Sequence, residues 1–463
     1  MFVRDQTVPR LVAVLFTALA AAFFSYLAGF PPKAVLALSV FFAEISATLL
    51  LWANRLPIAF IGTGLLFFLG ALDVKSFLEF ANLDVIFFLV GMMAFIGVLE
   101  ERMFFEHLVA KVLDAFRGNG VLVVFSLMVL SGALAALIDE VTSIVIMTSF
   151  ALALARAARV SPVPLVLLSV FATNIGSSAT VIGNPVGVLV AFRGGLTFGD
   201  FLRWATPIST LALAIVVVLS FRFFRGYIYE FSANISRGAT PLEPEGGGVG
   251  GFGRDAVLFA STVVALALHH QLEELLHLEK NTLLMAIPFI AAGISIVLDL
   301  EVGMRAFREK VEWPTVVFFA LLFASVGALE SSGFTEYFSH LLAQAGGGVY
   351  ESTLVVYTVA ATLMSAFMDN VLAVAVLLPV VEKFQGTGIP VFPFYWVTLF
   401  SATIGGNLTF IGSTANIVAL SLLEKAGHEK PSFSEWVRHS SWASLVPLAV
   451  AVLLVYLQTP LMP

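Results

Sequence analysis

Long apolar stretches dominate this sequence and leave little room for a fold outside a membrane. Hydrophobic residues make up 59% of its 463 residues and charged residues only 12%, whereas a soluble chain carries about 25% charged residues. A membrane-spanning helix needs about 20 predominantly apolar residues, and stretches close to that length recur along the whole chain. The sequence therefore predicts an all-α polytopic membrane protein.

The charged and sulfur-containing residues exclude several functions. The net charge is −7 and no Lys/Arg-rich run is present, which argues against nucleic acid as a partner. The chain has no cysteine, so it can form neither disulfides nor thiolate metal sites, and it has no thiol nucleophile. We expect no cofactor, no catalytic residue and no enzymatic activity.

Two apolar stretches, 121–156 and 351–382, each contain acidic residues near the middle. A re-entrant hairpin of two half-helices explains both. The other stretches then give about 11 transmembrane helices, the first of them near the N-terminus. If the N-terminus is cytoplasmic, 18 of the 24 lysines and arginines lie on the cytoplasmic side, as the positive-inside rule requires. We therefore expect a multi-pass protein of the plasma (inner) membrane, with a cytoplasmic N-terminus.

The second half of the chain repeats motifs of the first. Asp139-Glu140-Val141 recurs 230 residues later as Asp369-Asn370-Val371, and the Gly-rich segment 174–184 recurs 229 residues later as 403–413. Each half has an odd number of crossings, so the halves are predicted to be inverted repeats. Inverted repeats with interrupted helices indicate a secondary transporter. The predicted divisions are an N-terminal transmembrane helix (1–33), a first inverted repeat (34–224), a cytoplasmic Gly/Pro-rich linker (225–255) and a second inverted repeat (256–463).

The two predicted hairpin tips carry acidic residues at membrane depth. These are Asp139 and Glu140 in the first tip and Asp369, followed by Asn370, in the second. A charge at the bilayer centre costs about 2.5–3.5 kcal/mol, and no predicted span core contains a lysine or arginine. A bound cation or proton would balance these charges. The alternative is that the carboxylates only cap the half-helices.

A Gly-, Asn- and Pro-containing break follows each hairpin. Such breaks unwind a helix and expose carbonyl oxygens, which suit a hard cation. The alternative is close packing of small residues between helices. The candidate ion-binding residues are Asp139, Glu140, Thr142, Asn174, Gly176, Ser178, Thr180, Asn184, Asp369, Asn370, Gly405, Asn407, Thr409, Ser413 and Asn416. Leaving aside the two glycines, we expect the residues from Asp139 to Asn184 to line one cation site and those from Asp369 to Asn416 to line a second. Sodium ligands are proposed at Asp139, Asn174, Asn184, Asp369 and Asn407.

These paired motifs resemble the ion transporter superfamily. Within it they are similar to ArsB-type arsenite permeases, NhaD-type Na⁺/H⁺ antiporters, the melanosomal P protein and citrate-transporter-like permeases. The resemblance implies a homodimer with elevator-like scaffold and transport domains, the latter carrying both hairpins and both broken helices. The chain departs from the pattern at Glu140, where relatives carry Asn, and at Asn184, where Asp is common.

The acidic tips decide between transporter types. A cation–proton exchanger needs carboxylates that alternate between a metal ion and a proton, whereas an anion would meet like charge. The sequence therefore favours a Na⁺/H⁺-type antiporter working by alternating access, with Na⁺ and/or H⁺ as coupling ions. The alternatives are Na⁺- or H⁺-coupled transport of citrate-like or dicarboxylate anions, and arsenite efflux. An intramembrane aspartyl protease and a channel are remote alternatives.

Overall fold

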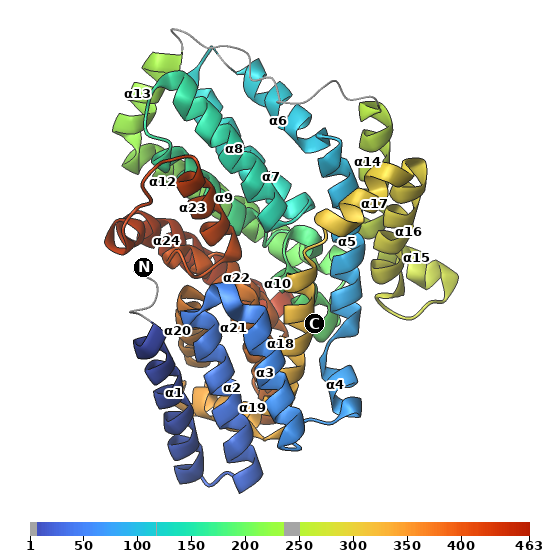
Figure 1. The fold of residues 1–463 in the computed structure, drawn as a ribbon, viewed down its shortest axis with the longest axis vertical. Helices are drawn as coiled ribbons and strands as arrows, with labels where there is room; N and C mark the ends of the chain where they lie inside the picture. Colours follow the sequence, from blue (N-terminus) through green and yellow to red (C-terminus); the bar gives the residue numbers. More distant parts are fainter. Residues whose placement is uncertain (1–6, 117, 236–250) are drawn as a thin grey trace. The chain divides into compact units, whose positions relative to one another are not determined.

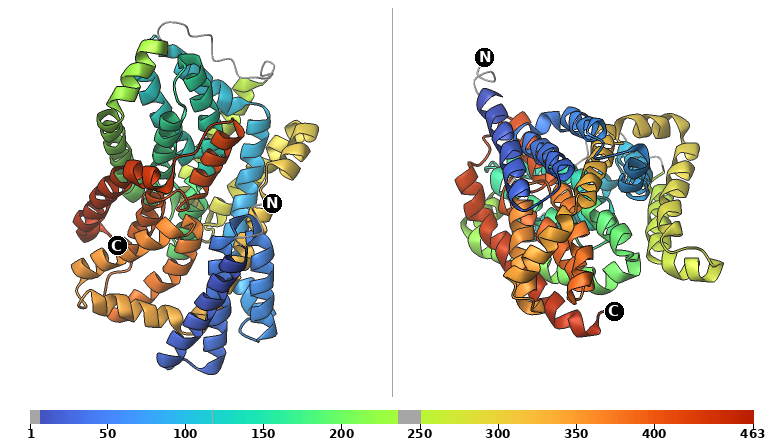
Figure 2. Two further views of the ribbon diagram at one scale, coloured as in Figure 1. Left: turned by 60° about the vertical axis from the view of Figure 1, so that its left-hand side comes forward. Right: turned by 90° about the horizontal axis from the view of Figure 1, so that it is seen from below.

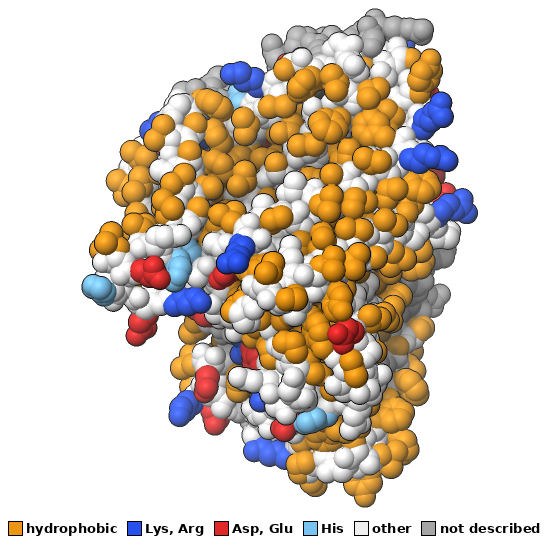
Figure 3. Space-filling view, turned by 180° about the vertical axis from the view of Figure 1, so that it is seen from behind, with side chains coloured by type: hydrophobic (Ala, Val, Ile, Leu, Met, Phe, Trp, Pro, Cys, Tyr) orange, Lys and Arg blue, Asp and Glu red, His pale blue; other side chains and the backbone are white. Residues whose placement is uncertain are grey.

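The computed structural model describes residues 7–116, 118–235 and 251–463 and is helical throughout these ranges (Figure 1). Within them, nine helices are long and apolar enough to cross a membrane, or ten if the bent pair α14–α15 forms one span. The predicted all-α polytopic fold class is confirmed. The nine include Gly120–Leu137, Glu140–Ala158 and Asn370–Thr387, which belong to the predicted hairpins, so this count is not directly comparable with the expected 11 transmembrane helices. On the face in Figure 3, hydrophobic side chains cover most of the surface.

The chain divides into two compact units, and each unit takes segments from both halves of the sequence. Unit 1 comprises 1–90, 312–356 and 375–391, and unit 2 comprises 91–311, 357–374 and 392–463. The predicted boundaries divide the chain by its repeated motifs, whereas the two units divide it by compactness. The units therefore do not test these boundaries, which stay a prediction. Most of the predicted linker, 236–250, lies outside the described residues.

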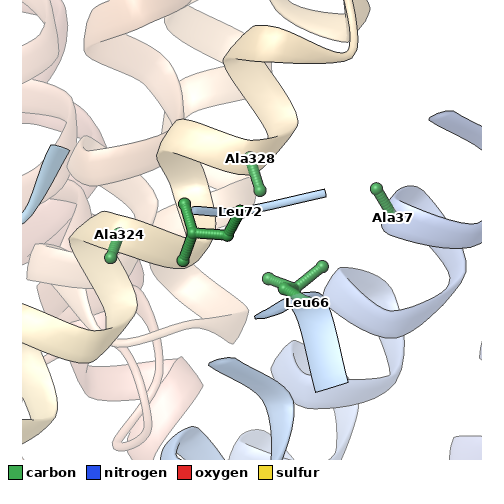
Figure 4. Packing of buried hydrophobic residues seen from close by; sticks show 5 residues of the cluster. All are labelled: Ala37, Leu66, Leu72, Ala324 and Ala328. Carbon is green, nitrogen blue, oxygen red and sulfur yellow. The ribbon is translucent and has the colours of Figure 1, made fainter. Parts of the chain in front are cut away.

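Unit 1 is built around three packed helices, α2, α3 and α18. Small side chains allow these helices to approach one another, and the buried cluster of Ala37, Leu66, Leu72, Ala324 and Ala328 lies between them (Figure 4). Beside this cluster, the hydroxyl groups of Thr63 and Ser325 lie 3.1 Å apart and join α3 to α18. The helices of unit 1 are α1 (Thr7–Leu27), α2 (Pro32–Leu50), α3 (Arg55–Phe68), α4 (Val74–Phe80), α18 (Trp313–Ser331) and α19 (Phe334–Ala345). Helices α1 and α2 lie side by side (Figure 2).

Unit 2 contains the first hairpin and both broken helices. Its helices are α6 (Phe104–Ala115), α7 (Gly120–Leu137), α8 (Glu140–Ala158), α9 (Val163–Gly176), α10 (Pro185–Gly194), α11 (Phe198–Asp200), α12 (Thr206–Phe223), α13 (Arg225–Ile235), α14 (Phe252–Ala267), α15 (His269–Leu276), α16 (Thr282–Leu298), α17 (Leu300–Glu309), α22 (Phe392–Thr403), α23 (Thr414–Lys425) and α24 (Phe433–Gln458). Three further helices, α5 (Leu83–Glu101), α20 (Tyr350–Phe367) and α21 (Asn370–Lys383), carry the chain from one unit into the other.

Both hairpins turn at the predicted acidic residues. Helix α7 ends at Leu137 and α8 begins at Glu140, while α20 ends at Phe367 and α21 begins at Asn370. Each connection is therefore two residues long and ends in an aspartate. The second turn, with the adjoining parts of α20 and α21, belongs to unit 2. Both tips thus lie in the same compact unit.

Candidate functional site

The aspartates of the two tips cap the helices that follow them. A carboxylate oxygen of Asp139 accepts hydrogen bonds from the backbone N–H groups of Val141, at 2.7 Å, and Thr142, at 2.9 Å. The carboxylate of Asp369 accepts one from Val371 at 3.1 Å. Its other oxygen accepts the hydroxyl of Thr414 at 2.6 Å. An N-terminal carboxylate is stabilised by the free N–H groups and by the helix dipole. Capping therefore accounts for part of the charge compensation that these two acids require.

The residues that follow the caps meet across the two halves of the chain. The amide nitrogen of Asn370 donates to both carboxylate oxygens of Glu140, at 3.1 and 3.3 Å. These two residues occupy equivalent positions of the repeat, 230 residues apart. Ser177, next to the first helix break, donates a longer bond of 3.4 Å to Glu140. Glu140 is only 1% exposed, and its hydrogen-bond partners in the described residues are an amide and a hydroxyl, both neutral.

The helix breaks occur where glycine and proline predict them. Helix α9 ends at Gly176, and α10 begins at Pro185 with Asn184 as its cap, accepting the N–H of Gly187 at 2.7 Å. In the second half, α22 ends at Thr403 and α23 begins at Thr414, capped by Ser413. Proline has no N–H to donate, so its place in the first turn costs no helical hydrogen bond.

Each break packs against the hairpin of its own half through equivalent contacts. The hydroxyl of Thr180 donates to the carbonyl of Ala136, and that of Thr409 donates to the carbonyl of Ala366. Glycine permits the close approach. A Cβ at Gly176 would lie 2.1 Å from the carbonyl oxygen of Gly132. Close packing of small residues, the alternative to ion binding, is therefore present at this break.

A buried amide cluster joins the two breaks to each other. The side-chain nitrogen of Asn174 donates to the side-chain oxygens of Asn407 and Asn416, both at 2.7 Å. Its oxygen accepts the hydroxyl of Ser413 at 3.0 Å. Asn416 in turn donates to the carbonyls of Gly406 and Thr409, both at 2.9 Å. All four polar side chains are completely buried.

The structure thus groups the candidate residues differently from the two predicted sets. Asn174 of the first set contacts three residues of the second, and Glu140 of the first contacts Asn370 of the second. Ser178 has its partners elsewhere: its hydroxyl donates to the carbonyl of Ile175 and lies 2.7 Å from the hydroxyl of Ser209 on α12. Gly405 lies against Thr362 on α20. The candidates nonetheless share one interior: eleven polar members are at most 5% exposed, and Asp139 and Thr142 are half-buried.

Sequence reasoning missed two contributors, Ser177 and Thr414. Besides its bond to Glu140, Ser177 accepts the side-chain amide of Asn184 at 2.7 Å. The repeat pairs Ser177 with Gly406, which has no side chain, so a comparison of the halves discards it. Its place between Asn174 and Asn184 in a break was the available signal.

The oxygen atoms that the amide cluster could offer to a metal ion belong to neutral amides, hydroxyls and carbonyls rather than to a set of carboxylates and imidazoles. In the part of the chain that the structure describes, no group of three or more His, Asp or Glu residues is placed to hold a metal ion. A cation at the tips would therefore draw on amide, hydroxyl and carbonyl oxygens together with single carboxylates. This is a mixture that hard cations accept.

The chain matches a family model described as a citrate transporter, CitMHS, over residues 50–382 and 336–461. It is 28% identical to the uncharacterized transporter Rv2684 of Mycobacterium tuberculosis, with 76% of this chain and 81% of that protein covered. It is 24% identical to the P protein of Homo sapiens, where the match covers 72% of this chain and 48% of that protein.

A solved structure shares the fold. It is described as the crystal structure of the Alcanivorax borkumensis YdaH transporter, which reveals an unusual topology. The TM-score is 0.58 at 14% sequence identity, with 93% of this chain and 99% of that chain covered. At this identity the likeness concerns the architecture alone.

Proposed function

The chain belongs to the CitMHS citrate transporter family. We propose that this membrane transporter exchanges protons for sodium ions at its two hairpin tips. The proposal rests chiefly on Glu140. This carboxylate is buried, and its described hydrogen-bond partners are neutral. An uncompensated charge in such a place is costly, so a proton or a metal cation has to accompany it. A group that can take either is what an exchanger requires.

The neighbouring caps support a shared ion-binding region. The carboxylates of Asp139 and Asp369 already accept hydrogen bonds from helix N–H groups. These bonds stabilise the negative charge without removing it. Together with Glu140 they concentrate acidic groups around the contact between Glu140 and Asn370. In alternating access, such a region would be loaded from one side of the membrane and emptied on the other.

The direct test compares Glu140→Gln with wild type in proteoliposomes. Ion flux is measured across a panel of Na⁺, K⁺ and pH gradients. Glutamine keeps the size and hydrogen-bonding capacity of Glu140 but can hold neither a proton nor a charge. We expect Na⁺-dependent proton movement to be lost or to become independent of pH near neutrality. Glu79→Gln, an exposed change on α4, is the matched control and should behave as wild type. Full activity with an unchanged pH profile in Glu140→Gln would refute the proposal.

Coupled transport of citrate-like anions is the second candidate. The family description favours it, and so does one structural observation. Helices α8, α10, α21 and α23 all begin in this interior, and helix N-termini favour anions. Bound cations would have to screen the acids at the tips. Citrate added to the same liposomes separates the two candidates, because only coupled anion transport predicts citrate uptake driven by the ion gradient.

We further propose that the protein is a homodimer of the plasma (inner) membrane with a cytoplasmic N-terminus. Topology can be tested directly, because the chain has no native cysteine. Gly118→Cys and Val160→Cys flank the first hairpin. If the hairpin is re-entrant, an impermeant thiol reagent labels both from the same side. Labelling from opposite sides would show that the chain crosses the membrane between the two positions, contrary to the proposal.

A further inference from the structure

A group of charged residues at the end of α5 lies apart from the helix tips. The amine of Lys310 donates to the carboxylate of Glu100 at 2.6 Å and lies 3.8 Å from that of Glu101. Arg305 on α17 donates to the other oxygen of Glu101 at 2.8 Å. The stem of Lys310 packs directly on Gly97, where a Cβ would lie 2.6 Å from the Lys310 Cβ. Both contacts fasten the end of α17 to α5.

These contacts lie beside a connection between the two units. The chain leaves unit 2 after Val311, the residue next to Lys310, and enters unit 1 at Glu312. Helix α5 is another such connection, since its first part belongs to unit 1 and the rest to unit 2. Lys310 therefore ties together two of the segments on which the chain passes between the units.

Glu106 lies on the neighbouring helix α6 and is not a partner in the ion pairs of Lys310 and Arg305 given above. Its Oε2 atom is buried and has no hydrogen-bond partner among the described residues. The groups that act on its charge are Glu100, which repels it, and Lys310 and His107, which attract it. Burial raises the pKa of Glu106 to about 7, and the charge of Glu100 adds to the effect.

Other charged groups lie on α6 and on the helices around it. Arg102 on α5 binds Asp255, at the start of α14, at 2.7 Å and Asp299 at 3.3 Å, and Arg254 also lies by Asp255. Helix α7 carries no ionisable side chain. On α6 itself, Lys111 and Asp114 follow one and two turns later. Of the amines nearby, Lys310 is the one whose charge acts on Glu106, and it is bound to Glu100, so an ionised Glu106 would compete with Glu100 for it.

We propose that Glu106 is a regulatory proton-binding site, separate from the ion-binding tips, that controls the Lys310 latch between α17 and α5. With the proton bound, Glu106 is neutral and Lys310 stays with Glu100. When the proton leaves to solvent, the new carboxylate draws Lys310 away and the end of α17 is released from α5. The site does not depend on which ion the tips transport.

The test measures release of α17 directly and needs no transport assay. Full-length protein in lipid nanodiscs is followed by hydrogen–deuterium exchange of segment 300–312 at about pH 6 and about pH 8, each relative to an unstructured peptide of the same sequence. Loss of a charge-assisted hydrogen bond should change exchange by at least about tenfold, which corresponds to about 1.4 kcal/mol. We expect wild type to lose about tenfold in protection at the higher pH.

Two variants decide the mechanism. Glu106→Gln should keep high protection at both pH values. Glu336→Gln is the matched control, because Glu336 is the repeat equivalent of Glu106, 230 residues later, and is exposed on α19. This variant should behave as wild type. The same pH dependence in Glu106→Gln, or none in wild type, overturns the proposal. Lys310→Met should give low protection at both pH values. If it retains a pH-dependent change, competition for Lys310 is wrong even where Glu106→Gln fails to fold.

Discussion

The two helix tips have the same construction and different chemistry. In each, a two-residue turn ends in an aspartate that caps the next helix, and a threonine in the following break donates to the carbonyl three residues before that cap. They differ at the next position, where the first tip has Glu140 and the second Asn370, and these two residues bind each other. The shared parts build the turn and its cap, whereas the position after the cap carries a carboxylate in one tip and a neutral amide in the other.

The strongest challenge to this comparison removes charge from each tip and keeps its cap. Asparagine caps a helix about as well as aspartate, so Asp139→Asn and Asp369→Asn should leave thermal unfolding nearly unchanged. Because the cation would lose a carboxylate, we expect transport in proteoliposomes to fall to background in both variants. If only one variant loses transport, the tips are unequal in function as well as in composition. Wild-type flux in both would show that the aspartates serve only as caps.

The next largest effect concerns the amide cluster that joins the halves. Asn174→Leu removes the hydrogen-bond partner of buried polar atoms on Asn407, Asn416 and Ser413. Each unsatisfied group costs about 1–3 kcal/mol. We expect a loss of about 3–5 kcal/mol in stability, measured by denaturant titration in micelles.

Thr403→Val is the control for Asn174→Leu, because it changes the equivalent residue of the second half. Among the residues that the structure describes, the hydroxyl of Thr403 bonds only within its own helix, to the carbonyl of Leu399 at 2.8 Å. Its loss should cost about 1 kcal/mol or less. Equal costs for the two variants would contradict the special role of Asn174.

A smaller difference separates the two caps when they are truncated. Asp139→Ala loses a cap worth about 1 kcal/mol. Asp369→Ala loses a cap and also leaves the Thr414 hydroxyl without its acceptor, so it should cost about 2 kcal/mol. In a Thr414→Val background the excess should disappear. An excess that persists there would place its origin elsewhere in the tip.

The smallest effect comes from a cap on the surface of unit 1. Asp73 accepts the N–H of Ser76 at 2.8 Å at the start of α4, and this bond lowers the pKa of Asp73. A lowered pKa in the folded state stabilises the fold above the unfolded-state pKa, and this contribution is lost as the pH falls through the folded-state value. Asp73→Asn should therefore make unfolding temperature slightly less sensitive to acid below about pH 4. A steeper acid dependence in the variant would contradict this sign.

The sequence predicted the turns and breaks but not which side chains meet. Acidic residues inside apolar stretches located both tips, because burying them needs a special backbone. Glycine and Pro185 located the breaks, because these residues disfavour helix. The pairing of Asn174 with Asn407 and Asn416 could not be predicted, since a repeat aligns residues by ancestry and not by distance in space. For the same reason Ser177 was overlooked, its counterpart being a glycine.

The Asn174 cluster also has an evolutionary consequence. Asn174 stands where the second copy has Thr403, and its three partners all come from that second copy. The hydrogen bonds of this amide are therefore shared between the two halves. A gene encoding the first half alone would specify a protein whose Asn174 lacks the three side-chain partners that it has in the full chain.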